Sequence, residues 1–209
     1  MDRKTNRILI FVVIVLTLIS ISEGVYIFKL KQTTNELQTP NARTEYSSLL
    51  VPYREGILWG FADRNGNIVI KPQFEDVWFF TDGLAKVRLK RLYGFIDAKG
   101  NFVIKPQFEV VRSFSEGLAL FMKNGLFGFI DTKGNMIIAP QFENAMDFKE
   151  GLAPVKKNGL WGYIDKSGKF VIEPMYTFAS TFENGIAHIS FNGIDGYINK
   201  NNQKFFKDN

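Results

Sequence analysis

The chain has 209 residues, 45% of them apolar and 22% charged, a balance that excludes wholesale disorder. Its net charge of +5 is spread without a dense basic block, so nothing indicates a nucleic-acid-binding protein. Cysteine is absent, which excludes disulfides, thiolate metal sites and cysteine nucleophiles.

The N-terminus carries a membrane signal. The basic residues 1–7 precede an apolar span, Ile8 to Phe28, that is about 31 Å long as a helix and matches a bilayer core of roughly 30 Å. We therefore predict one transmembrane helix, a signal-anchor, within residues 1–28, with the basic end in the cytoplasm. The alternative is a signal peptide cleaved near Ser22, which would make the protein secreted.

Residues 29–48 are polar, contain Pro40 and lack a periodic apolar pattern, so they are predicted to form a linker. Residues 49–209 are then the folded domain. Because it follows the membrane signal, we expect this domain outside the cytoplasmic membrane.

The folded domain consists of repeats. Five glycines lie 34 residues apart, namely Gly60, Gly94, Gly128, Gly162 and Gly196. Around each glycine the same pattern recurs, as in LYGFIDAKGNFVIKPQF of the second repeat. A strict period is typical of proteins in which each copy packs mainly on its neighbours. We predict five repeats, the last of them truncated.

Each repeat is predicted to be a three-stranded antiparallel meander. In the second repeat, Leu84–Leu89 alternates between apolar and polar residues, which indicates a half-buried strand. Leu92–Asp97 is apolar on both faces and is predicted to be a central strand. The third strand, Phe102–Lys105, is expected to end at Pro106, which cannot donate a ladder hydrogen bond, and a connector follows.

The turns and the glycines have distinct predicted roles. Three later repeats join their first two strands by Asn-Gly, which favours a type I′ turn, whereas Lys90-Arg91 must form a different or strained turn. Asp97 begins a turn after the central strand and is expected to accept hydrogen bonds from its backbone. The glycine column, including Gly94, is expected to allow a backbone or a ring to approach closely.

These repeats are predicted to stack as an all-β, open, twisted array. Helical repeats of the same period are excluded, because Gly and Pro would fall inside helices. A closed propeller is the less favoured alternative, since propeller blades typically have four strands. The last repeat also carries Asp195 where the others have an aromatic residue, as expected of a cap. That aromatic column contains Trp59, Tyr93, Phe127 and Trp161.

The recurring aromatic-G-F/Y-I-D-x-x-G motif, followed by P-Q-F and F-x-x-G-L-A, resembles the bacterial WG-repeat family. The resemblance covers about Leu49 to Phe206. It implies an extracytoplasmic or surface-associated β-repeat protein that acts as an interaction scaffold, with no catalytic residues to transfer. Tyr93 and Phe127 replace the motif tryptophan, which indicates that any aromatic residue serves there.

The repeated aromatic and acidic residues could form a functional site or could have a structural role. The aromatic column could be a ladder that stacks on sugar rings, or the core between repeats. The recurring aspartates could suggest calcium, but one aspartate per turn is typical of turn capping. Catalytic carboxylates should be exceptions to the repeat, and His188 has no catalytic partners in the sequence. We therefore expect no enzyme activity, no metal and no cofactor.

The better candidates are residues that depart from the repeat consensus. A basic cluster in the second repeat and one tryptophan in the connector before it form the candidate interaction surface, namely Trp78, Lys86, Arg88, Lys90 and Arg91. The surface would bind a partner protein or an anionic wall polymer. The predicted function is a membrane-tethered, non-catalytic scaffold for protein interaction. The alternative is a cell-wall carbohydrate-binding module that uses the repeated aromatic residues.

Overall fold

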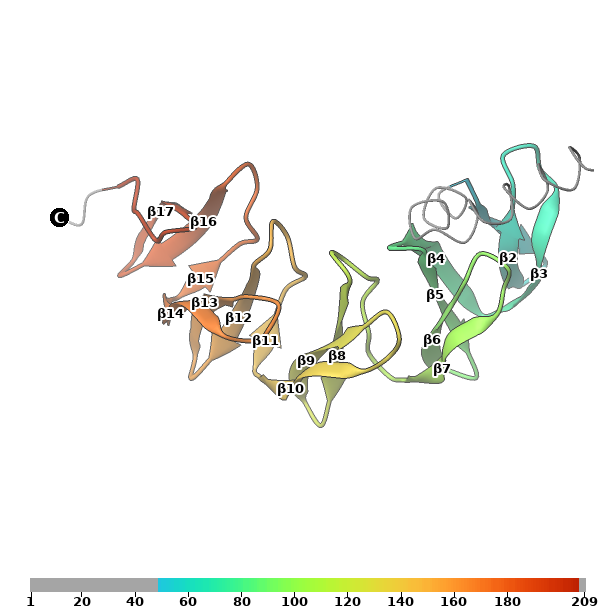
Figure 1. Cartoon of the computed structure of the whole chain (residues 1–209), viewed down its shortest axis with the longest axis horizontal. Helices are drawn as coiled ribbons and strands as arrows, with labels where there is room; N and C mark the ends of the chain where they lie inside the picture. The colour runs from blue at the N-terminus through green and yellow to red at the C-terminus, as the bar shows by residue number, and fades with distance from the viewer. Residues whose placement is uncertain (1–48, 207–209) are drawn as a thin grey trace, which may run out of the picture. The chain divides into compact units, whose positions relative to one another are not determined.

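The computed structural model of the protein describes residues 49–206 (Figure 1). The predicted transmembrane helix in residues 1–28 and the predicted linker in residues 29–48 lie outside the described residues. Within the described residues, no helix is long and apolar enough to span a bilayer. This part of the chain is all-β, as predicted, with no helix among its elements.

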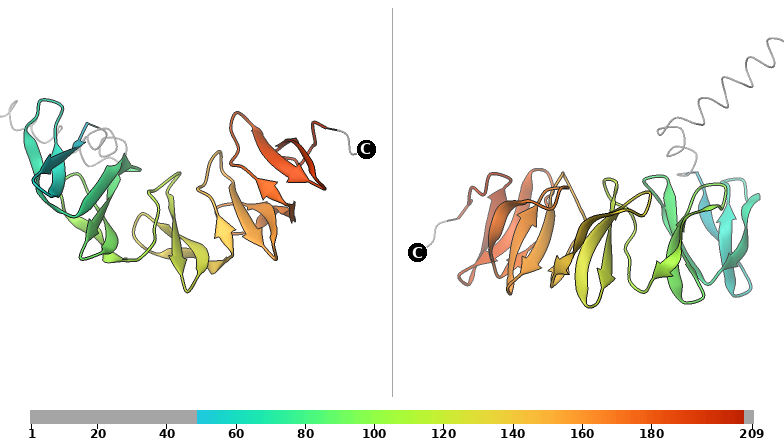
Figure 2. Two further views of the ribbon diagram at one scale, coloured as in Figure 1. Left: turned by 180° about the vertical axis from the view of Figure 1, so that it is seen from behind. Right: turned by 60° about the horizontal axis from the view of Figure 1, so that its bottom comes forward.

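The strands form five antiparallel sheets, numbered here in chain order (Figures 1 and 2). Sheets 1 and 2 contain β1 (Val51–Glu55), β2 (Leu58–Ala62) and β3 (Ile68–Phe74), then β4 (Asp76–Thr81), β5 (Leu84–Leu89), β6 (Leu92–Ile96) and β7 (Phe102–Phe108). Sheet 3 contains β8 (Leu118–Lys123), β9 (Leu126–Asp131) and β10 (Met136–Phe142). Sheets 4 and 5 contain β11 (Asn144–Ala145), β12 (Ala153–Lys157), β13 (Leu160–Ile164) and β14 (Phe170–Tyr176), then β15 (Phe178–Ala179), β16 (Ile186–Phe191) and β17 (Ile194–Asn199).

The predicted three-stranded meander is incomplete, because the connector supplies a further strand. It forms β4 in sheet 2, β11 in sheet 4 and β15 in sheet 5, each paired with the strand that follows. In sheet 3 the same segment makes the isolated bridge between Val111 and Phe121. The connector contains buried residues such as Val77, and a buried backbone needs hydrogen-bond partners. Pairing with the next strand supplies those partners.

In sheets 1 to 4 the third strand of the repeat is also longer than predicted, whereas in sheet 5 the corresponding segment makes only the bridge between Ile198 and Lys204. In sheet 2, β7 continues through Pro106 to Phe108. Phe95 pairs with Ile104 but Tyr93 pairs with Phe108, so β7 bulges out between these two pairs. The proline lies in this bulge, where its missing N–H is not needed for the ladder.

The bulge explains the glycine column. A Cβ atom added to Gly94 would lie 2.6 Å from the carbonyl oxygen of Ile104 and 2.7 Å from the nitrogen of Pro106. Gly60, Gly128 and Gly162 face the same backbone in their own sheets. At Gly196 the close neighbour is the ring of Phe206. The predicted close approach of a backbone or a ring is therefore confirmed.

Consecutive sheets pack face to face through four apolar clusters. Between sheets 1 and 2, for example, Phe61 and Ile70 of sheet 1 pack with Val87 and Ile96 of sheet 2. Equivalent clusters join sheets 2 and 3, sheets 3 and 4, and sheets 4 and 5. Each sheet therefore buries an apolar face on each sheet that neighbours it in sequence, as expected of a repeat protein.

Candidate functional site

The aromatic column lies within these clusters. Trp161 is 7% exposed and belongs to the cluster between sheets 4 and 5. Trp59, Tyr93 and Phe127 are partly buried and pack against the clusters of their own sheets. The rings are used in packing between sheets, which is the structural role weighed in the sequence analysis. Asp195, the polar replacement in sheet 5, is exposed.

The aspartate of each repeat caps a turn, as predicted. The backbone N–H groups of Lys99 and Asn101 both donate to Oδ1 of Asp97 at 2.9 Å. The same pattern recurs at Asp63, Asp131 and Asp165. No group of three or more metal-ligating side chains occurs in residues 49–206. The aspartate oxygens instead satisfy the backbone of their own turns.

The turn hydrogen bonds predict a dependence of stability on acid. The Asn67 amide and turn N–H groups hold the pKa of Asp63 below its ordinary 3.8, and bonds from Ser167 lower that of Asp165. At Asp131 burial acts to raise the pKa, but hydrogen bonds from Asn135 outweigh it. A lowered pKa in the folded state stabilises it above the unfolded pKa, and this contribution is lost as the pH falls through the folded value.

We therefore expect the urea midpoint of the full-length chain to fall steeply below about pH 4, measured by circular dichroism between pH 6 and pH 2. Asp165→Asn should flatten part of this fall, because an asparagine oxygen still accepts the turn hydrogen bonds, as Asn199 does in sheet 5. Glu173→Gln, which changes an exposed carboxylate on β14, should leave the slope unchanged. A midpoint that stays level below pH 4 would contradict the expectation.

The structure brings together the first part of the candidate interaction surface. The Nζ atom of Lys86 lies 3.8 Å from the centroid of the Trp78 ring and 5.3 Å from that of Tyr93. It also donates a hydrogen bond of 3.3 Å to the carbonyl oxygen of Val111 in the next repeat. Burial lowers the pKa of Lys86, and the nearby Asp76 opposes this shift. Lys86 is therefore held by rings and a carbonyl rather than free in solvent.

Two of the other basic residues, Arg88 and Arg91, contact Glu75 at the first edge of the same sheet. Arg88 forms an ion pair with Glu75, with its Nε atom 3.4 Å from Oε2. The backbone N–H of Arg91 donates to the same oxygen at 3.2 Å. The side chains of Lys90 and Arg91 are exposed at the β5–β6 turn. Glu75 therefore orients the turn and leaves two cationic groups facing solvent.

The β5–β6 turn is strained, which the sequence left open. Lys90 has a φ of 53° and Arg91 a φ of 66°, the left-handed values that Asn124 and Gly125 adopt in sheet 3. A residue with a Cβ atom is disfavoured there by roughly 1–2 kcal/mol. The turn has left-handed residues at the same two positions as the turns of sheets 3, 4 and 5, but lysine and arginine are unsuitable for it.

Replacing Lys90-Arg91 by Asn-Gly should therefore stabilise the protein. We expect Lys90→Asn with Arg91→Gly to raise the free energy of unfolding by about 1 kcal/mol, because the turn strain disappears while glycine adds some entropy to the unfolded chain. The Glu75 hydrogen bond is retained, as Glu143 shows by accepting from Gly159. Urea unfolding measures the change. The reverse swap at Asn158 and Gly159 should destabilise by a similar amount, and equal stability of all three proteins would refute the strain.

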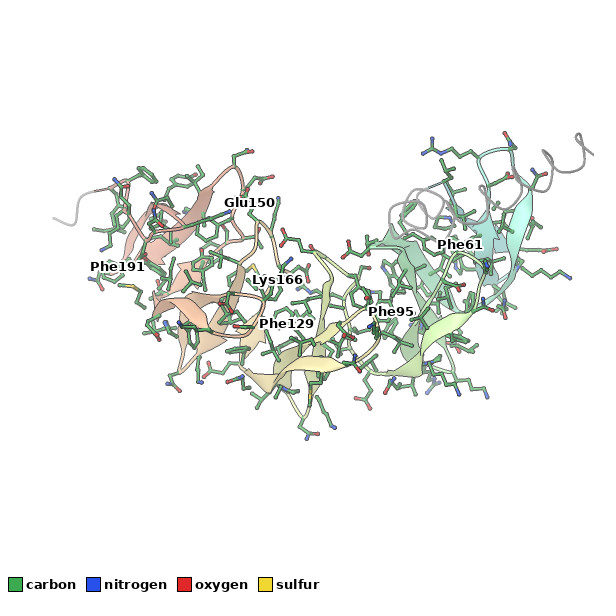
Figure 3. All side chains as sticks on the ribbon, in the orientation of Figure 1. Phe61, Phe95, Phe129, Glu150, Lys166 and Phe191 are labelled. Carbon is green, nitrogen blue, oxygen red and sulfur yellow. The ribbon has the colours of Figure 1, made fainter. Side chains whose placement is uncertain are left out.

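A row of carboxylates that bridge consecutive repeats was not predicted from the sequence. Asp82, Glu116 and Glu150 accept hydrogen bonds from the backbone N–H groups of Gly117, Gly151 and Gly185, each one repeat further on. Lys166 and Lys200 add ion pairs to Glu116 and Glu150, and Figure 3 labels Glu150 and Lys166. The only sequence signal is that each of these carboxylates precedes a glycine, namely Gly83, Gly117 and Gly151. These contacts join repeats and do not form a binding site.

Comparison with known proteins gives a family and two solved structures. The family model described as WG containing repeat matches residues 59–92, 93–127, 127–161 and 161–193, which together span more than half of the chain. No curated protein sequence is matched. Hsv2p of the yeast Kluyveromyces lactis is similar at 10% identity with a TM-score of 0.49, over 77% of this chain and 60% of that one. A form of the same yeast protein with loop 6CD replaced by a Gly-Ser linker has 10% identity and a TM-score of 0.47, over 75% and 61% of the two chains. The present chain thus spans about 60% of the length of these structures.

Proposed function

Because the chain belongs to the WG containing repeat family, we propose that its repeat domain is a non-catalytic scaffold that binds a partner protein. The N-terminal segment tethers this domain to the outer side of the bacterial cytoplasmic membrane, a placement supported by the apolar span that follows the basic residues 1–7. The sheets form an open, twisted array, supported by clusters that join only consecutive sheets and by the absence of a ladder between β1 and β17 within the described residues.

The observation that carries the proposal is the strained turn at Lys90 and Arg91. Three other sheets use Asn-Gly at this position, and that turn fits the backbone without a penalty. Backbone strain that a simple substitution would remove is typical of residues kept for function. The strained residues are also the two exposed cations of the candidate surface.

The chemistry of the surface favours an acidic segment of the partner. Arg88, Lys90 and Arg91 present cationic groups beside Glu75, which is already bonded to the turn. Trp78 supplies a half-buried ring at the side of this cluster, and its contact with Lys86 fixes the position of that ring. Arginine and tryptophan are enriched among the residues that dominate binding at protein interfaces.

Site-specific photo-crosslinking in cells tests the proposal. A photoreactive phenylalanine analogue replaces Phe79, which lies beside Trp78 on β4 and is 64% exposed, in the full-length chain. We expect a crosslinked partner protein, and we expect Lys90→Asn with Arg91→Gly to reduce its yield at least tenfold. Lys71→Gln with Lys105→Gln removes two exposed charges from β3 and β7 and should retain the crosslink. Equal yields in both double variants, or crosslinking to wall polymer alone, would overturn the proposal.

A further inference from the structure

Four internal interfaces share one aromatic contact. In each, a phenylalanine from the connector packs on the ring that lies two residues after the motif aromatic in the preceding sheet. The pairs, with their centroid distances, are Phe61–Phe80 at 4.9 Å, Phe95–Phe114 at 4.6 Å, Phe129–Phe148 at 4.8 Å and Tyr163–Phe182 at 4.8 Å. Figure 3 labels three of the receiving rings. All four receiving rings are 0% exposed. In all four internal interfaces, a connector phenylalanine therefore covers the receiving ring.

The fifth receiving ring is open. Tyr197 of β17 lies one repeat after Tyr163, and within the described residues no connector covers it. Tyr197 is 50% exposed, whereas its four equivalents are fully buried. Beside it the ring of His188 lies 5.4 Å away, and Phe178, itself 41% exposed, lies 5.5 Å beyond His188. Sheet 5 thus exposes a row of three rings on its outer face.

This face differs from the internal ones in carrying a negative charge. Asp195 occupies the column that holds Trp161 in sheet 4, and it is exposed. It makes no ion pair within the described residues. Ser190, its cross-strand partner on β16, adds a hydroxyl group to the same face. A ligand that covers the rings would therefore place a cationic group opposite Asp195.

We propose that the outer face of sheet 5 is a second interaction surface, which binds a protein segment that presents a phenylalanine next to a basic residue. The phenylalanine takes the position on Tyr197 that Phe148 takes on Phe129. The basic residue pairs with Asp195. This inference shares with the proposed function only the class of partner, because its residues are separate from those of the surface around Lys90 and Arg91.

The chain itself supplies a probe for this surface. The peptide ENAMDFKEGLA, residues 143–153, contains Phe148 followed by Lys149 and forms the connector that covers Phe129 within the protein. Its fluorescein-labelled form is titrated with the full-length chain, and binding is followed by fluorescence anisotropy. We expect saturable binding of one peptide per chain. Tyr197→Ala, or Phe148→Ala in the peptide, should weaken binding about tenfold, as one lost aromatic contact predicts.

Three further variants make the test specific. Tyr197→Phe should bind as the unaltered protein does, which excludes a loss of folding as the cause of weak binding. Asp195→Asn should weaken binding and reduce its dependence on salt. Lys90→Asn with Arg91→Gly should leave peptide binding unchanged, so this proposal and the proposed function fail independently.

Four outcomes would overturn the inference. The first is the absence of saturable binding, and the second is binding that Tyr197→Ala does not change. The third is self-association of the chain that Tyr197→Ala abolishes, which would identify a second copy as the occupant. The fourth is displacement of the peptide by an oligosaccharide, which would assign the face to a sugar.

Discussion

Gly94→Ala is expected to lower the free energy of unfolding by about 3 kcal/mol or more. The added methyl group would lie 2.6 Å from the carbonyl oxygen of Ile104 and 2.7 Å from the nitrogen of Pro106. Both atoms belong to the backbone of β7, so no side chain can rotate away and the bulge itself must move. The loss exceeds the gain of about 1 kcal/mol that alanine brings to a strand through its lower backbone entropy. Urea unfolding of the full-length chain measures the difference.

Gly125→Ala is the matched control for Gly94→Ala. Gly125 has a φ of +78°, and a Cβ atom there meets nothing within 4 Å. The substitution should therefore cost only the strain of the left-handed conformation, roughly 1–2 kcal/mol. If Gly94→Ala costs no more than Gly125→Ala, the close approach of β7 does not determine the glycine column.

Phe129→Ala is expected to destabilise the protein by about 3–5 kcal/mol and to divide its unfolding into two steps. Phe129 is fully buried between sheets 3 and 4, and its ring lies 4.8 Å from that of Phe148. Truncation leaves a cavity at the interface between sheets 3 and 4, which joins sheets 1–3 to sheets 4 and 5 within residues 49–206. In a linear array, the coupling between neighbouring repeats keeps unfolding cooperative.

Calorimetry combined with hydrogen exchange of the full-length chain tests this expectation. Phe129→Ala should give two transitions, and amides of one half should lose protection before those of the other half. Phe205→Ala removes a ring that is 56% exposed and should leave a single transition with little change in stability. If Phe129→Ala instead unfolds in a single transition at a lower temperature, the coupling between the two halves does not depend on this interface.

The local elements of the fold could be predicted from the sequence because each has a short-range signal. The alternation of Leu84–Leu89 matches β5 at both ends. The Asn-Gly turns, the capping role of Asp97 and the packing of consecutive repeats all follow from patterns within one period. These features depend on steric rules that act over a few residues.

The fourth strand and the length of the third strand could not be predicted for the opposite reason. Whether Asp76–Thr81 pairs with β5 depends on how the chain turns at Asp82 and Gly83. Asp-Gly favours a tight turn, but the equivalent pairs in the next two repeats are Glu-Gly, which gives only a weak turn signal. Pro106 was expected to end its strand, but a bulge accommodates a proline without ending the strand. Both errors concern pairing between backbone segments, which depends on the path of the folded chain and not on the local sequence.

The candidate interaction surface stays a prediction, and the structure shows only how its side chains lie. Trp78 and Lys86 do meet, but the structure uses Lys86 as a support within the protein. The exposed ring of Tyr197 was not predicted, although Asp195, two residues before it, was recognised as the mark of a cap. A polar replacement at one position does not by itself show which ring of the same strand is left uncovered.

Because every interface between sheets repeats the same face-to-face contact, gene rearrangement can change the length of this domain in whole steps. An in-frame deletion of residues 118–151 would join Gly117 to Leu152, and the bridging carboxylate and connector ring would meet equivalent partners. Recombination between the near-identical segments would therefore produce longer or shorter variants that fold immediately. Selection can then adjust the distance between the first sheet and a distal surface by copying repeats, with no change to the packing between them.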